Sequence, residues 1–125
     1  MIKLNKENIM TECLFLISED ATSRVHVIPP NNGRIPRISY DVLSENPYVF
    51  TEEEFYHEVH VVRRQREDLN LATYNIRKSE LLQQFGWGIH RNSEGKLALI
   101  PAESAKYKEL SQKLHTQRAY RIRAA

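Results

Sequence analysis

The sequence of 125 residues has one cysteine, four glycines and no long apolar run. A single cysteine, Cys13, excludes an internal disulfide and suits a reducing cytosol. No stretch approaches the roughly 18 apolar residues of a membrane helix. The stretch MIKLNKENIMTECLFLIS has no uninterrupted apolar core, so no signal peptide is expected. These absences predict one cytoplasmic domain over residues 1–125, with residues 1–10 and 116–125 frayed.

The formal net charge of +2 is too small to indicate a polyanionic partner, but the charge is unevenly distributed. Five acids and no Lys or Arg lie between Glu45 and Glu58, whereas six bases and one acid follow from Lys106 onward. A basic end of this kind suits nucleic acid or an acidic partner. Short charge runs are more often solvated surface, and we favour that interpretation.

Two helices are expected in the first half of the chain. Pro36 suits the first turn of a helix that Pro47 ends. Thr51 and Glu54 have the spacing of a capping box, which opens a helix over about residues 52–65. The helical period places its apolar side chains on one stripe: Phe55, Val59 and Val62. Its opposite, solvated face is expected to carry Glu53, His57, His60 and Arg64.

The remaining segments predict a sheet and two further helices. ECLFLIS (residues 12–18) reads as a buried strand, and residues 19–36, with three prolines, as a long loop. Residues 67–77 show no clean period and are expected to be irregular. Ser79 can cap a short helix that Gly86 closes in the left-handed conformation. A last helix is expected over residues 102–114.

Residues 85–101, FGWGIHRNSEGKLALIP, predict a hairpin whose register follows from its turn. Asn92–Gly95 suits a type I turn with a glycine bulge, which sets His90 opposite Ala98. One face then carries the bulky side chains of Trp87, Ile89, Leu97 and Leu99. The other face carries Gly88, His90, Ala98 and Ile100. Gly88 permits close approach of a ligand or of another element, and a packed helix is the favoured reading.

The fold class that follows is α+β. A small antiparallel sheet, made of the N-terminal strand and the C-terminal hairpin, is expected to pack against three or four helices.

Four short motifs add a resemblance: YDVL (residues 40–43), NPY (46–48), GWGIH (86–90) and EG (94–95). In this order they resemble a family of small bacterial domains of unknown function. The likeness covers about the last two-thirds of the chain. It departs just before the hairpin, where the family has a stretch with Gly, Pro and Cys and this chain has ATYNIRKSELLQQ. The resemblance implies no activity.

Metal binding and nucleophilic catalysis find little support. Glu54, His57 and His60, with His90 or His26, have the residue types of a carboxylate–histidine site. The two helical histidines are three residues apart without an HExxH pattern, so neither a metal nor a cofactor is expected. Cys13 lies in an apolar run and is expected to be inert. His90 is the best single candidate for a general base, although a structural histidine is the favoured reading.

A nucleic-acid-binding alternative rests on the order of three helices and a hairpin, which is that of a winged helix. The residues that would contact nucleic acid are Lys78, Gln83, Arg91, Arg118 and Arg121. The long segment before the short third helix counts against it.

The preferred function is a non-enzymatic domain that binds a protein partner or a small ligand. Its recognition surface is predicted at Tyr40, Tyr48, Trp87, Gly88 and His90. The winged-helix protein is the alternative, and an enzyme that uses His90 comes third.

Overall fold

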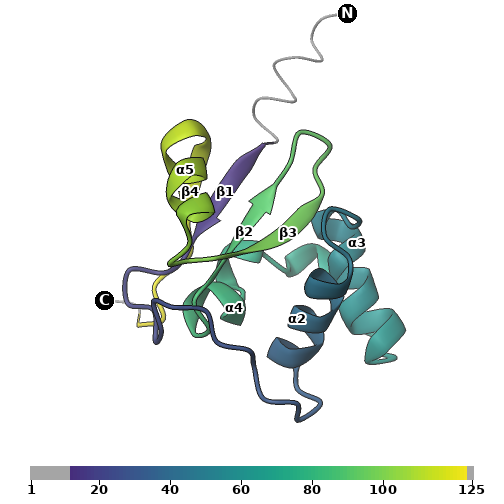
Figure 1. Cartoon of the computed structure of the whole chain (residues 1–125). Helices are drawn as coiled ribbons and strands as arrows, with labels where there is room; N and C mark the ends of the chain where they lie inside the picture. The colour runs from purple at the N-terminus through teal and green to yellow at the C-terminus, as the bar shows by residue number, and fades with distance from the viewer. Residues whose placement is uncertain (1–11, 124–125) are drawn as a thin grey trace, which may run out of the picture.

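The computed structural model describes residues 12–123, and the predicted fraying of residues 1–10 lies outside them. A four-stranded mixed sheet carries helices on both faces (Figure 1). The elements are, in chain order, β1 (Cys13–Leu16), α2 (Ile35–Glu45), α3 (Glu52–Tyr56), η1 (His57–Arg63), η2 (Leu71–Thr73), η3 (Ile76–Lys78), α4 (Glu80–Gln83), β2 (Trp87–Arg91), β3 (Leu97–Pro101), α5 (Ala105–Lys113) and β4 (His115–Arg118). The predicted α+β class is confirmed. No helix within residues 12–123 is long and apolar enough to span a bilayer.

The sheet has the order β3-β2-β1-β4. The predicted strand and hairpin pair antiparallel, with Leu14 opposite His90. The fourth strand, β4, lies parallel to β1, with Cys13 opposite His115. Residues 116–118, expected to be frayed, belong to this strand. Its sequence HTQR has no apolar alternation, which is typical of a polar edge strand. A hydrophobic pattern therefore does not predict this strand.

The hairpin has the register that its turn predicts. His90 pairs with Ala98 and Ile89 with Leu99. The backbone amide of Asn92 donates to the Lys96 carbonyl at 2.9 Å, and Gly95 has a φ of 83°. Turn chemistry alone therefore determines which hairpin side chains share a face.

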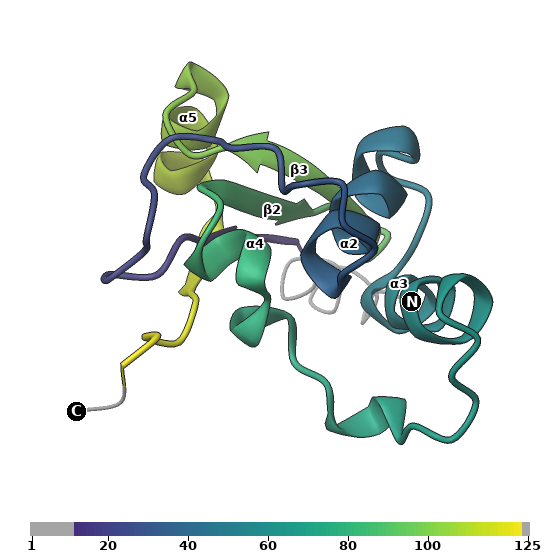
Figure 2. The ribbon, with the colours of Figure 1, turned by 90° about the horizontal axis from the view of Figure 1, so that it is seen from below.

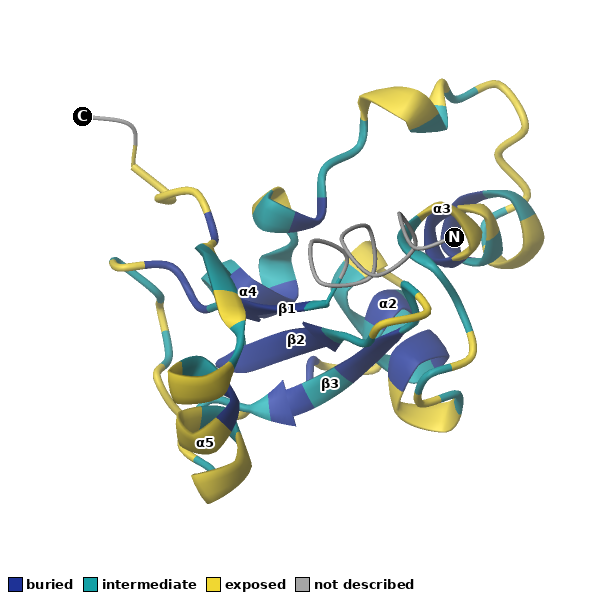
Figure 3. Ribbon diagram, turned by 90° about the horizontal axis from the view of Figure 1, so that it is seen from above, coloured by how far each residue is buried: buried dark blue, intermediate teal, exposed yellow. Residues whose placement is uncertain are grey.

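The alternation along each strand divides the core between the two faces of the sheet. Phe15 and Ile89 lie in the larger cluster, with side chains from α2, α3 and α4. Leu14 and Ile100 lie in a smaller cluster beneath α5, which Figure 2 shows on the side of the sheet away from α2. The strands β1, β2 and β3 are mostly buried, whereas the segment that follows η1 is largely exposed (Figure 3).

The capping box forms as its spacing predicts. The amide of Glu54 donates to the Thr51 hydroxyl at 3.2 Å, and the amide of Thr51 donates to the Glu54 carboxylate at 2.9 Å. These two bonds satisfy amides at the start of α3 that no helical carbonyl can reach.

The helix that follows the capping box is not α-helical throughout, and here the predicted faces are wrong. From His57 to Arg63 the chain forms a π-helix, η1, in which the amide of Arg64 donates to the Val59 carbonyl. A bond from i+5 to i widens the turn and rotates every later side chain relative to an α-helix. Val62, expected in the core, is therefore 51% exposed, and His60, expected on the solvated face, is only 2% exposed.

Candidate ligand-binding site

The five residues predicted as a recognition surface form two contacting pairs, Tyr40 with Trp87 and Tyr48 with His90, and a glycine packed against α5. Tyr40 and Trp87 pack together, with ring centroids 5.6 Å apart. The indole nitrogen of Trp87 donates to the Val27 carbonyl at 3.0 Å. The polar atom of Trp87 is thus used to hold the loop of residues 19–34, which runs from the α5 side of the molecule to α2 (Figure 2).

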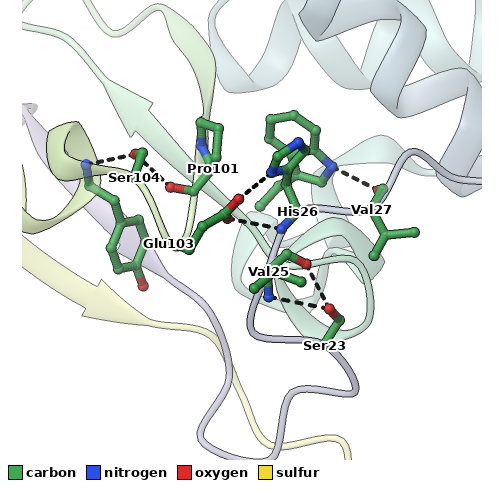
Figure 4. Close-up of polar contacts among 9 residues, drawn as sticks. Ser23, Val25, His26, Val27, Pro101, Glu103 and Ser104 are labelled. Carbon is green, nitrogen blue, oxygen red and sulfur yellow. Dashed lines mark hydrogen bonds and ion pairs between the residues drawn. The ribbon is translucent and has the colours of Figure 1, made fainter.

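This loop also packs a histidine, His26, against Trp87, and Figure 4 shows His26 beside Glu103. The His26 ring lies 5.1 Å from the Trp87 ring and is bonded through Nδ1 to the Glu103 carboxylate. The His26 backbone amide donates to the same carboxylate at 3.0 Å. Gly86 fits here because a Cβ at this position would collide with the Val25 carbonyl. Trp87 therefore anchors the loop to the sheet.

Gly88 accommodates a helix, which was the favoured reading. A Cβ at Gly88 would lie 2.5 Å from Cε2 of Tyr107 on α5. The Tyr107 hydroxyl accepts from the Ile17 amide at 3.0 Å, which fixes the ring over the sheet. Tyr107 thus fills the space that a ligand would need above Gly88.

His90 and Tyr48 do come together, through a hydrogen-bonded chain. The Tyr48 hydroxyl lies 2.8 Å from His90 Nδ1, and the Glu12 carboxylate lies 3.2 Å from Nε2. Burial and the nearby Glu12 charge raise the pKa of Tyr48, so its hydroxyl keeps its proton. Tyr48 donates to Nδ1 while Nε2–H donates to Glu12. Both nitrogens of His90, a residue 7% exposed, are thus satisfied within the protein.

The residues of the nucleic-acid alternative are largely engaged with the protein itself. Gln83 donates to the Tyr120 carbonyl at 2.9 Å, and Arg118 donates to the Ile17 carbonyl at 2.8 Å. Arg91 lies 3.7 Å from the Glu52 carboxylate. Arg121 is exposed and Lys78 borders a cavity. The helix that would enter a groove, α4, has only four residues, too short for a reading helix.

Ile122 and Arg123, in the basic segment, are bonded to an acid of the same domain. The two carboxylate oxygens of Asp20 accept from the amides of Ile122 and Arg123 at 2.9 and 3.0 Å. These bonds and the Ser18 hydroxyl hold the pKa of Asp20 well below its usual range. The basic end is therefore attached to the body of the domain.

A cavity of about 320 Å³ lies elsewhere, between α2, the α3–η1 helix and residues 73–81. We call it the His60 cavity. The residues that line it and carry the discussion below are Ser39, Tyr56, His60, Tyr74, Lys78 and Glu80. A second cavity, of about 450 Å³, shares Tyr56 and Tyr74 and is bordered also by Glu52, Glu53 and His57.

Three rings form the wall of the His60 cavity. Tyr56 and His60 are stacked at 6.1 Å with an interplanar angle of 15°. Tyr74 meets His60 edge-on at 4.5 Å and Tyr56 edge-on at 5.2 Å. Tyr74 comes from the irregular segment between η2 and η3, so the wall joins a helix to a distant loop. Such geometries are those that aromatic pairs prefer.

Arg64 fixes the proton position on His60. Its guanidinium lies 2.5 Å from His60 Nδ1. Arginine can only donate, so Nδ1 must accept, and the neutral ring carries its proton on Nε2. Burial, together with the charges of Arg64 and Arg66, lowers the pKa of His60 and favours this neutral form.

The Nε2–H group of His60 has no hydrogen-bond partner within residues 12–123. No side-chain nitrogen or oxygen in this part of the chain is both sealed from solvent and unpartnered. Nε2 therefore opens into the cavity that the ring lines. The hydroxyls of Ser39, which is 6% exposed, and of Tyr56 also make no hydrogen bond among the described residues; Ser39 lines this cavity, and Tyr56 lines both cavities. Polar groups that face an apolar pocket and have no partner in the protein are free to bond a ligand, so this cavity is a candidate ligand site.

The sequence contains little that marks this site. An α-helical period puts His60 on the solvated face, and only the π-helical turn brings it inward. Tyr74 lies in a segment without a clean period. Tyr56, which directly follows Phe55 of the predicted apolar stripe, is the one residue of the site with a local signal in the sequence. In the part of the chain that the structure describes, no three His, Cys, Asp or Glu side chains gather as a metal site.

The fold and the cavity define a small α+β domain with an aromatic, hydrogen-bond-donating pocket. The chain belongs to a family of unknown function, DUF6157, whose model matches residues 5–125. Neither a curated protein nor a solved structure matches it.

Proposed function

We propose that the protein is a non-enzymatic domain that binds a small ligand in the His60 cavity. The observation that carries this proposal is the Nε2–H group of His60, buried with its ring and without a partner in the described part of the chain. A volume of about 320 Å³ lies in the range of small-molecule sites, which are mostly apolar with a few placed polar groups.

The proton positions in the cavity favour binding over catalysis. Because Arg64 occupies Nδ1, the Nε2 atom of His60 already carries a proton and cannot accept another as a general base. Burial raises the pKa of Tyr56 well above its ordinary value, with the Glu52 charge and Tyr74 adding to the effect. Its hydroxyl therefore stays protonated near neutral pH. Both groups can offer a hydrogen bond and neither is prepared to take a proton.

The test is a fragment screen against the ¹⁵N-labelled protein, with binding located by amide shift changes. We expect hits that move the amides of Ser39, Tyr56 and Tyr74, and we expect His60→Phe to weaken them about tenfold or more. Phenylalanine keeps the stacked ring and removes the Nε2–H donor together with the Nδ1 atom that accepts from Arg64. The matched control is His57→Phe, which changes an exposed histidine on the same helix that borders the second cavity. Hits that survive His60→Phe unchanged would refute the assignment.

The surface predicted at Tyr40, Tyr48, Trp87, Gly88 and His90 is a second proposal, with a protein partner as its ligand. One observation supports it: Tyr48 has a φ of 59°, a left-handed conformation that a bulky residue seldom adopts outside strained or functional positions. This proposal requires His90→Ala to abolish partner binding at a temperature at which the variant is still folded. A cytoplasmic location remains a prediction of the composition.

A further inference from the structure

We infer that the His60 cavity selects a planar ligand that carries a carboxylate, with a carboxylate oxygen on His60 Nε2–H and the ring against Tyr56 and Tyr74. This inference rests on the proposed function and deepens it by naming the chemical class of the ligand.

The first support is that His60 can offer only a hydrogen-bond donor to the cavity. His60 Nε2 can only donate, because the bond from Arg64 holds the other nitrogen as the acceptor. The hydroxyls of Ser39 and Tyr56 at the same cavity can donate as well. A carboxylate offers about four lone pairs in a plane and can accept from several such donors at once.

The second support is the charge behind His60. No carboxylate among residues 12–123 forms an ion pair with Arg64. Asp68, which senses the Arg64 charge, is bound through two 2.9 Å hydrogen bonds to Arg66. The Arg64 charge is therefore uncompensated at the back of the histidine that offers the donor.

The acids near the cavity do not cancel this charge. Glu80 borders the cavity, but Lys78 borders it too and offsets it. Glu52, on the far side of Tyr56, accepts from the Ile76 amide at 3.2 Å and lies 3.7 Å from Arg91. A bound anion is thus favoured over a neutral ligand of the same shape, and a cation is disfavoured.

The third support is the apolar wall. Tyr56, His60 and Tyr74 line the cavity and pack ring against ring, which suits a flat apolar body. A phosphate group, with its higher charge and stronger hydration, needs more donors than this wall offers. A carboxylate attached to a ring matches both parts of the site.

The experiment compares three probes of one shape by amide-shift titration at pH 7.5: 2-naphthoate, 2-naphthamide and 2-naphthylmethylamine. We expect 2-naphthoate to bind at least tenfold more tightly than 2-naphthamide, and the amine to bind most weakly, all with shifts at Ser39, Tyr56 and Tyr74. Arg64→Gln should reduce the preference for the carboxylate to less than threefold, and Arg64→Lys, which keeps the charge, should retain most of it. The ¹⁵N shifts of His60 report its tautomer in each variant.

The outcomes separate this inference from the proposed function. If the amide binds in the cavity as tightly as the carboxylate, selection of an anion is refuted and the binding site stands. If no probe moves the cavity amides at millimolar concentration, while the protein is folded, both are refuted. The comparison of carboxylate and amide on the unmodified protein needs no variant, so a failure of Arg64→Gln to fold does not affect it.

Discussion

The protein buries two histidines, and they differ in what their second nitrogen does. His90, on strand β2, bonds Tyr48 through Nδ1 and Glu12 through Nε2. His60, on η1, bonds Arg64 through Nδ1 and leaves Nε2 facing a cavity. Burial is similar, at 7% and 2% exposed, so burial does not distinguish them. What distinguishes them is the second nitrogen: both nitrogens of His90 are bonded within the protein, whereas Nε2 of His60 is open to a cavity and can bond a ligand.

The two histidines also differ in the regularity of the backbone that carries them. His90 lies in a regular antiparallel register, whereas His60 lies in a π-helix. Irregular helical turns lower stability locally and are frequent at functional sites. The sequence motif GWGIH draws attention to the first histidine, although the open hydrogen-bonding capacity is at the second.

The largest expected effect is the loss of folding stability when His90, the histidine with both nitrogens bonded, is replaced. His90→Phe should lower the free energy of unfolding by about 2 kcal/mol, because it leaves the Tyr48 hydroxyl and Glu12 without their partner. This corresponds to roughly 8 °C in melting temperature for a domain of this size. Thermal unfolding followed by circular dichroism measures it.

The matched control is His60→Phe, which should change the unfolding free energy by less than about 1 kcal/mol. It removes one bond to the partly exposed Arg64 and also removes an unsatisfied donor. If His60→Phe proves the more destabilising of the two, the contrast between the histidines is wrong.

A smaller effect is expected in the pH dependence of stability. The pKa of His60 is lowered in the folded protein by burial and by Arg64 and Arg66, while the unfolded chain has the ordinary value of about 6.5. Between these two values the unfolded state binds more protons, so stability is full above about pH 6.5 and falls as the pH is lowered toward the folded pKa. Urea unfolding at pH 8 and pH 5.5 should show a larger loss for the unmodified protein than for His60→Phe. Equal losses in the two proteins would contradict the lowered pKa.

The smallest expected change in stability is at Val62, and it tests whether the π-helical turn rotates Val62 outward and His60 inward. Val62→Thr should change the unfolding free energy by less than about 0.5 kcal/mol, because Val62 is exposed on η1. Val59→Thr, three residues earlier and fully buried, should cost about 2 kcal/mol by placing a hydroxyl in the core. Similar losses for both variants would mean that the helix is α-helical and that His60 faces solvent.

The features that could be predicted are those that local chemistry determines. The turn Asn92–Gly95 sets the hairpin register, and Thr51 with Glu54 sets the start of α3. The strand β1 follows from an apolar run. In each case a few neighbouring residues fix the backbone, so no distant contact is needed.

The features that were missed depend on distant contacts. The π-helical turn cannot be read from an i, i+3, i+4 pattern, since that pattern assumes the geometry in question. The polar strand β4 exists because β1 offers a parallel edge. The candidate cavity requires Tyr74, on an irregular segment, to reach His60. The predicted site residues Tyr48 and His90 do meet, but as a satisfied pair.

Because η1 is a π-helix, the number of residues in it determines which side chain faces the cavity. A turn that closes from i+5 to i holds one residue more than an α-helical turn. Removing a single residue between Tyr56 and Arg64 would allow α-helical closure and would turn the side chains beyond it by about 100°. The capping box at Thr51 and the sheet would be untouched, yet a different side chain would lie in the cavity. The number of residues in this helix, as well as their identity, thus determines whether this fold presents a histidine to a ligand.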